Sequence, residues 1–386
     1  MKKTKGKKGI TLVALVITIV ILLILAGISI STLTNTGIFQ KAVDAKNVSG
    51  NAEKEQGQTL SEYEEELNRY MPQELTDDKI NKVLSKTENT FLKDTNGNIF
   101  TLPAGFKMVV NEDTNNAKTV DKGIVIEDAT VDNEDNATAT NGSQFVWVPV
   151  GNIKKDDGTV VEINLDRYKF DTNGIPTSQG ENIIETYYSE TESKGNTIAK
   201  NITDFKNSVA TNGGYYIGRY EARTIAARNS ENDELTQITE KGTDKIYNFV
   251  TQIQAAKQAQ NMYSIDKYTS DLMNSYAWNT ATVFFQNCGT NKTYSRQFSL
   301  NDKLSQTGTN TLEDQNKIDQ QCNVFDMASN LREWITETSS FLDCPCVNRG
   351  GVYNDNSKRY MSSYGYHSIY DSKENTGFRP ILYINI

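Results

Sequence analysis

Hydrophobic residues occur in three different patterns along the chain. From Ile10 to Ile30 an uncharged run of 21 residues is long enough to cross the ~30 Å hydrocarbon core of a bilayer, because a helix rises about 1.5 Å per residue. Residues 32–71 carry apolar side chains at three- and four-residue spacing among charged ones, which predicts helix. From about Phe91 short apolar runs alternate with turn residues, which predicts strands.

The segment between the apolar run and Phe91 connects two different kinds of structure. We assign residues 32–90 to a helical stalk or linker. Glycines at positions 37, 50 and 57 argue against one unbroken helix. A solvated spacer and a packed, pilin-like helix both fit this pattern.

The alternating segments that follow indicate an α+β fold with non-local antiparallel strands. Asn96-Gly97 separates two short apolar runs and predicts a hairpin turn. Residues 123–126 and 144–150 predict further strands, and helical periodicity returns at 249–263 and at about 272–285. We divide this part into a small β-rich segment, 91–140, and a larger domain, 141–386.

The N-terminal charges orient the apolar run in a membrane. Residues 1–9 hold five lysines and no acid, and positive residues mark the cytoplasmic side of a membrane helix. The run is too long for a secretory signal peptide, and no small-residue cleavage site follows it. We therefore expect a single-pass protein of the cell membrane, with a transmembrane helix at 10–31 and the bulk of the chain extracellular.

Charge and histidine content exclude several functions. The chain has 49 acidic against 40 basic residues, and the basic residues form no stripe beyond the N-terminus, so we expect no nucleic-acid partner. His367 is the one histidine, which excludes metal motifs built from histidine pairs. The pattern indicates no metal or cofactor, and calcium binding stays open.

The four cysteines all lie in the C-terminal third, at positions 288, 322, 344 and 346. In an exported chain they allow three disulfide pairings. A bond within Cys344-Pro345-Cys346 would be strained. Disulfides and free thiols both remain open, because the sequence does not define the redox compartment.

The leader has a recognisable motif. Lys8-Gly9-Ile10-Thr11-Leu12-Val13 resembles the leader of type IV prepilins and pseudopilins. The resemblance implies a prepilin peptidase that cuts between Gly9 and Ile10, and methylation of the new N-terminal residue. That family usually has glutamate at the fifth mature position, where this chain has Ala14. Because the glutamate serves subunit assembly, incorporation into a pilus stays open.

Five segments of the larger domain stand in a family-specific order. They are FVWVP at 145–149, GYYIGRYEA at 214–222, NVFDMASNLREW at 323–334, NRGG at 348–351 and GFR at 377–379. Their order resembles that of formylglycine-generating-enzyme-like (sulfatase-modifying-factor) domains, which have a C-type-lectin fold. The resemblance implies structural roles: aromatic residues in the core, glycines at close backbone approaches, and arginines that are paired or stacked. The residues are Trp147, Asn330, Glu333, Trp334, Arg349, Gly350, Gly351, Phe378 and Arg379.

Enzymes of that family that use oxygen have two copper-binding cysteines, four and nine residues beyond the Gly-Gly pair. In this chain Asp355 and Tyr360 stand at those positions. A soft copper ion therefore lacks its thiolate pair. We expect no catalytic residues and no enzyme activity.

The segment between the last two motifs suggests recognition. Tyrosine provides rigid contact area, and serine, asparagine and aspartate provide adaptable hydrogen bonds, as in antibody binding loops. A polar loop with tyrosines packed on a sheet is the alternative. Within residues 347–379 the candidate ligand-binding residues are Tyr353, Asn354, Asp355, Asn356, Ser357, Tyr360, Ser362, Tyr364, Tyr366, His367 and Tyr370.

The same segment resembles the variable region of proteins diversified by retroelements, in which mutagenesis of asparagine codons yields Asn, Ser, Tyr, Asp, His and Gly. The sequence thus favours a surface-displayed, membrane-anchored protein that binds an external protein or glycan. A minor pilin or pseudopilin is the alternative. A formylglycine-generating enzyme is disfavoured by the missing cysteines.

Overall fold

The chain forms two compact units, Met1–Asn68 and Arg69–Ile386. The computed structural model describes residues 15–22, 46, 48–49, 54, 56, 71–129, 142–180, 202–263, 265–300, 304, 319–341, 343–354 and 359–385. In the first unit residues 15–22 are helical, and the described helices include none that is long and apolar enough to span a bilayer. The processing site Gly9–Ile10, the rest of the predicted transmembrane helix and most of the stalk lie outside the described residues.

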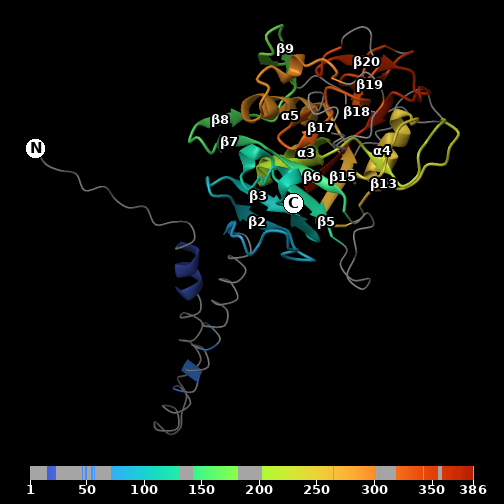
Figure 1. Ribbon diagram of the computed structural model, residues 1–386. Helices are drawn as coiled ribbons and strands as arrows, with labels where there is room; N and C mark the ends of the chain where they lie inside the picture. Colours follow the sequence, from blue (N-terminus) through green and yellow to red (C-terminus); the bar gives the residue numbers. More distant parts are fainter. Residues whose placement is uncertain are drawn as a thin grey trace, which may run out of the picture. The chain divides into compact units, whose positions relative to one another are not determined.

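The second unit is built on an antiparallel sheet with the strand order β15-β22-β11-β6-β5-β4 (Figure 1). Its strands are β4 (Phe106–Met108), β5 (Val125–Asp128), β6 (Gln144–Pro149), β11 (Gly214–Gly218), β15 (Tyr268–Leu272) and β22 (Pro380–Ile384). The central strands β6 and β11 are almost entirely buried. Strands covered on both faces consist of continuous apolar runs rather than alternating ones, which explains the Phe-Val-Trp-Val-Pro composition of β6.

Three helices cover this sheet. Helix α3 (Ile202–Asn212) packs on β11 and β22, α4 (Gln252–Gln260) on β15, and α5 (Ser275–Cys288) on β6. Thr251 and Gln254 form a reciprocal capping box at the start of α4, and Asn274 caps α5 by accepting from the Ala277 amide. Such caps satisfy amides that have no partner within the helix.

Strands and helices together confirm the expected α+β class. Antiparallel strands β2 (Thr90–Lys93) and β3 (Ile99–Leu102) flank the Asn96-Gly97 turn, as predicted. The helical patterns at 249–263 and 272–285 correspond to α4 and α5.

The boundaries between segments differ from those drawn on sequence. Residues 71–90 belong to the second unit, and β1 (Gln73–Glu74) pairs with β2 instead of extending a stalk. Strands β4 and β5 share the sheet of β6, so the β-rich segment 91–140 and the larger domain have one core. Short-range patterns predict strands but not which distant strands pair, which explains the difference.

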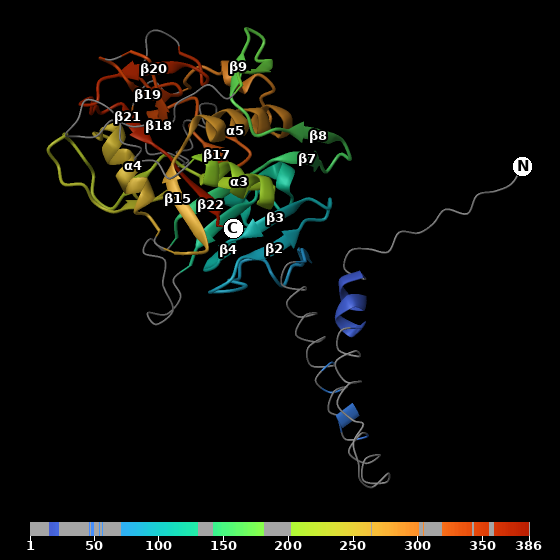
Figure 2. The same ribbon diagram turned by 180° about the vertical axis from the view of Figure 1, so that it is seen from behind.

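A second sheet has the order β20-β19-β18-β21 and contains parts of three of the five motifs noted in the sequence. Its strands are β18 (Arg332–Thr338), β19 (Cys346–Arg349), β20 (Tyr364–His367) and β21 (Thr376–Phe378). Strands β18, β19 and β20 lie at the end of the unit opposite β2 and β3 in both views (Figures 1 and 2).

The remaining strands form small two- and three-stranded sheets around the core. They are β7 (Gly151–Lys154), β8 (Val160–Ile163), β9 (Tyr168–Phe170), β10 (Pro176–Ser178), β12 (Arg223–Thr224), β13 (Ile238–Thr239), β14 (Lys245–Ile246), β16 (Gln320–Gln321) and β17 (Val324–Phe325).

Candidate binding face

A rigid support underlies the predicted binding segment. Trp334 in β18 is buried, and its indole N–H donates to the Val250 carbonyl at 2.8 Å. Arg379 and Glu333 form a fully buried ion pair at 2.6 Å. The same guanidinium donates to the carbonyls of Gly218 and Phe325, each at 2.8 Å. It therefore ties both sheets and β17 together. Trp147 and Phe378 are also buried in the core.

The two glycines after β19 allow close backbone contact. Gly350 has a φ of +89°, and a Cβ on Gly351 would lie 2.0 Å from the Ala328 carbonyl oxygen. Asn330 donates to Glu221 at 2.6 Å, and both residues are fully buried. The two glycines thus lie against the backbone of residues 327–328, and the Tyr353 amide donates to the Asn330 carbonyl at 3.0 Å. Glycine is required here because any side chain would push the glycine backbone away from residues 327–328.

Strand β20 presents two tyrosines on one side. Tyr364 and Tyr366 stand opposite Arg349 and Val347 of β19, whereas Gly365 and His367 alternate to the other side. The tyrosine rings are stacked with centroids 6.4 Å apart, and Phe341 meets Tyr366 edge-on at 5.4 Å. We call Phe341, Tyr366 and Tyr364 the aromatic row. Phe341 is 59% exposed and Tyr366 47% exposed, so solvent reaches this row.

A buried network of charged side chains contacts Tyr364, the least exposed residue of the aromatic row. The Arg349 guanidinium carbon lies 3.5 Å from the ring centroid of Tyr364. Glu337 bonds Arg349 at 2.9 Å and Arg167 at 3.1 Å, and all three are buried. Because Glu337 fixes the guanidinium, the cation–π contact fixes the ring. Burial, and then the nearby Glu337 carboxylate, raise the pKa of Tyr366.

Tyr360 lies in a second aromatic contact. Its ring stacks on Phe298 with centroids 4.4 Å apart, and the Arg296 guanidinium carbon lies 3.5 Å from its centroid. We call Arg296, Tyr360 and Phe298 the Tyr360 stack. Phe298 is 38% exposed and the other two are half-buried.

His367 does not join the aromatic row. Its ring packs edge-on against Trp334 at 5.3 Å, and its Nδ1 bonds Asp371 at 2.8 Å. Burial lowers the pKa of His367 although Asp371 opposes this shift. The sequence placed this residue in the binding set, but the period-two alternation of β20 turns it to the opposite side.

The other candidate residues differ in exposure. Tyr370 is 75% exposed, and Tyr353 is half-buried. Asn354 is exposed and accepts from Asn375 at 3.2 Å, and Ser362 is half-buried. Asp355, Asn356 and Ser357 lie outside the described residues. None of the five tyrosines is buried in the core.

Several residues of this region were not predicted from sequence. Phe341, Phe298, Arg296 and Glu337 lie outside residues 347–379 and carry no local motif. Phe298 meets Tyr360 through an antiparallel bridge between distant segments. The apolar side chains of Phe341 and Phe298 among polar neighbours were the available signal.

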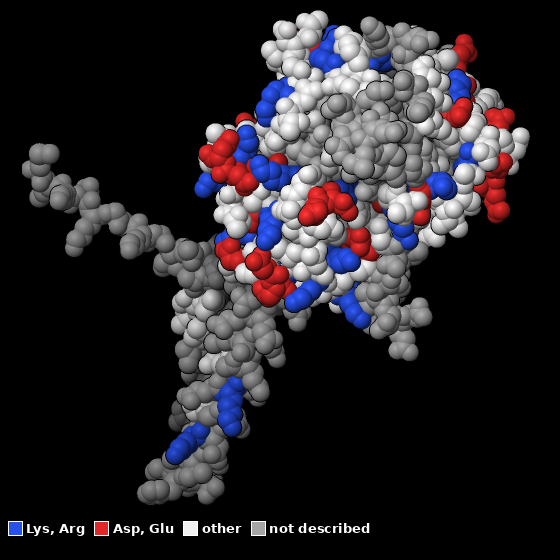
Figure 3. Space-filling model, in the orientation of Figure 1, with Lys and Arg blue, Asp and Glu red and all other residues white. Residues whose placement is uncertain are grey.

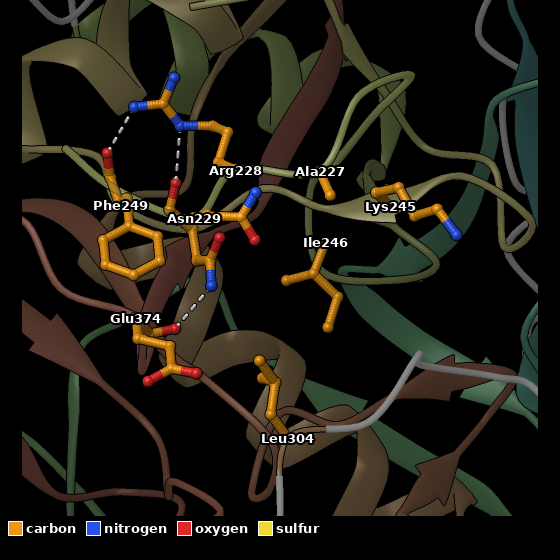
Figure 4. Close-up of a pocket in the computed structure, with 9 residues that line it drawn as sticks. Ala227, Arg228, Asn229, Lys245, Ile246, Phe249, Leu304 and Glu374 are labelled. Atoms are coloured by element: carbon orange, nitrogen blue, oxygen red, sulfur yellow. Dashed lines mark hydrogen bonds between the residues drawn. The ribbon is translucent and has the colours of Figure 1, made fainter. Parts of the chain in front are cut away.

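A pocket of about 350 Å³ lies beside the binding segment (Figure 4). Its walls include Ile246, Leu304 and Glu374. Arg228, which also lines it, donates to the carbonyls of Asp233, Glu234, Asn248 and Phe249 at 2.6–3.0 Å. The guanidinium of Arg228 therefore binds backbone carbonyls of its own chain. Burial, and then the nearby Glu374 carboxylate, raise the pKa of Tyr353.

Acidic and basic side chains are mixed on the face that Figure 3 shows. In the view of Figure 3 neither sign forms a continuous patch on that surface. Within the described ranges no three His, Cys, Asp or Glu side chains are arranged to hold a metal ion. The four cysteines are free thiols, and burial raises the pKa of Cys288 and of Cys346 to about 12.

Comparisons with known proteins identify no family. No family model matches the chain, and no curated protein matches its sequence. Treponema denticola variable protein 1 is 11% identical with a TM-score of 0.32, and the match covers 62% of this chain and 95% of that chain. CarF is 15% identical with a TM-score of 0.28, with coverage of 62% and 98%. At these scores the likeness establishes neither fold nor function.

Proposed function

We propose that this chain is a membrane-anchored, surface-displayed binding protein that contacts an external protein or glycan through the aromatic row and the neighbouring loop. The exposed tyrosines on a rigid buried support carry the proposal. Arg349 and Glu337 hold Tyr364, and Trp334 and the Arg379–Glu333 pair hold the sheet below. Preorganised aromatic side chains lose little conformational entropy on binding, so more of the contact energy becomes affinity.

Exposed residues on a buried support can vary in sequence without loss of the fold. The support consists of residues from the Asn…Glu-Trp, Arg-Gly-Gly and Gly-Phe-Arg motifs, whereas Tyr366 and Tyr370 project from it. Substitutions at exposed positions are usually tolerated, because little packing is lost. Diversification of the exposed positions within residues 347–379 by a retroelement, on a lectin-like fold, is therefore part of the proposal.

Replacement of Tyr366 or Tyr370 by alanine tests the binding role. The full chain in neutral-lipid nanodiscs would be screened against a glycan array and a random-peptide phage library, and the ligands selected by wild type would be titrated. We expect at least one substitution to cost about 2 kcal/mol of binding, roughly 30-fold in Kd. Unfolding should change by less than ~1 kcal/mol, because both side chains are exposed.

Val160→Ala is the matched control. Val160 is also exposed and lies in β8, far from β20 in both views, so its truncation should leave the same Kd unchanged. Large stability losses with intact binding would make the tyrosines packing residues and refute the proposal.

Anchoring and processing are tested by replacing Gly9 with leucine. If a prepilin peptidase removes the leader, wild type should lose residues 1–9 and the variant should keep them, as intact mass shows. Both proteins should fractionate with membranes, because residues 10–30 remain apolar. An identical processed mass in the two proteins would contradict peptidase cleavage, and full-length wild type in the soluble cytoplasm would contradict anchoring.

A further inference from the structure

The Tyr360 stack has the geometry of a preformed receptor. Arg296 ends the short helix η3 (Tyr294–Arg296). Its guanidinium and the Phe298 ring both stack on Tyr360, at 3.5 Å and 4.4 Å from the ring centroid. Two groups this close cannot share one face of a ring, so they cover opposite faces. Tyr360 is therefore held between a cation and an apolar ring.

Backbone contacts fix this arrangement before any ligand arrives. The amide of Met361 donates to Gln297 at 3.0 Å, and that of Ser362 donates to Ser295 at 3.1 Å. The Tyr360 amide donates to the Ser363 hydroxyl at 2.8 Å. Residues 295–298 and 360–363 are thus joined by backbone hydrogen bonds.

This unit is anchored to the core. The Ser295 amide donates to the Gln286 side chain of α5 at 2.9 Å, and Ser295 is fully buried. The backbone that carries Arg296 is consequently fixed to α5.

The charge of Arg296 has no counterpart in the described part of the chain. Arg349 and Arg379 are paired with buried glutamates, and Arg228 is bound to backbone carbonyls. Arg296 makes no hydrogen bond or ion pair through its guanidinium with the residues described, and its Nε is buried without an acceptor. A guanidinium stays protonated at any physiological pH. Its terminal N–H groups are therefore available to an anionic acceptor from outside.

We propose that Arg296 receives the carboxylate of an aspartate or glutamate on a partner protein, with Tyr360 and Phe298 contacting the apolar surface around it. The planar fork of a guanidinium matches a carboxylate in a two-bond arrangement. Arginine and tyrosine are enriched among the residues that dominate protein–protein binding energy, which favours a protein over a sugar. The inference rests on the proposed binding function.

The test uses the full chain in neutral-lipid nanodiscs and two labelled octapeptides, one alternating glutamate with tyrosine and the other glutamine with tyrosine. Wild type should bind the glutamate peptide at least about 10-fold more tightly, the gain expected of a charge-assisted hydrogen-bonded pair. Arg296→Gln should abolish the preference, and Arg296→Lys should restore part of it because charge returns without the planar fork. Lys292→Gln, which removes an exposed charge four residues away, should keep it.

Several results would overturn the inference. One is a preference for the glutamate peptide that survives in Arg296→Gln. Another is an equal loss of that preference in Lys292→Gln, which would indicate nonspecific electrostatic attraction. Binding of sialyllactose with no binding of the glutamate peptide would show that the carboxylate comes from a sugar. If neither peptide binds while a selected ligand still depends on Tyr366, the inference fails and the proposed function stands. If no selected ligand depends on the tyrosines, the proposed function itself fails.

Discussion

Replacement of Arg379 by methionine is expected to destabilise the second unit by about 3–5 kcal/mol, the range for removing one partner of a buried ion pair. Arg379 and Glu333 are both fully buried, and the arginine also satisfies the carbonyls of Gly218 and Phe325. Methionine fills similar space but leaves an uncompensated carboxylate and two carbonyls without donors. Urea unfolding followed by circular dichroism would measure the loss.

Two further variants separate charge from packing. Glu333→Met combined with Arg379→Met removes the orphaned carboxylate, so the double variant should regain at least about 1 kcal/mol relative to Arg379→Met. Arg359→Met changes a half-buried arginine within the binding segment and should cost less than ~1 kcal/mol. A loss below ~1 kcal/mol for Arg379→Met would mean that the pair does not hold the two sheets together.

Truncation of Trp334 to alanine should cost about 3–5 kcal/mol, as for other large buried aromatics. The side chain is 1% exposed, its N–H donates to Val250, and the ring supports His367. Its removal would leave a cavity between β18 and the segment before α4, and would leave the Val250 carbonyl without its donor. The same urea measurement applies.

Trp334→Phe provides the graded comparison. Phenylalanine keeps an aromatic ring in the site but cannot donate a hydrogen bond, so it should lose less than alanine does. We expect about 1–3 kcal/mol, from the unsatisfied carbonyl and the smaller volume. Equal, small losses for both variants would show that the Asn330…Trp334 segment is exposed to solvent.

Sequence alone determined those features that depend on near neighbours. The Asn-Gly turn between β2 and β3, the apolar run of β6 and the helical periods of α4 and α5 each reflect local conformational preference, and the structure contains all of them. The tyrosine-rich composition likewise indicated the candidate segment, in which Tyr366 and Tyr370 are exposed.

Only the tertiary structure decided which distant residues meet. Arg296 reaches Tyr360 because residues 295–298 pair with 360–362, and Glu337 joins Arg167 to Arg349 across segments far apart in sequence. It also decided which side of β20 each residue occupies, placing His367 against Trp334 and Tyr366 in solvent. A strand's alternation is visible in sequence, but the face turned to the core depends on register with its partner strand, which local pattern does not contain.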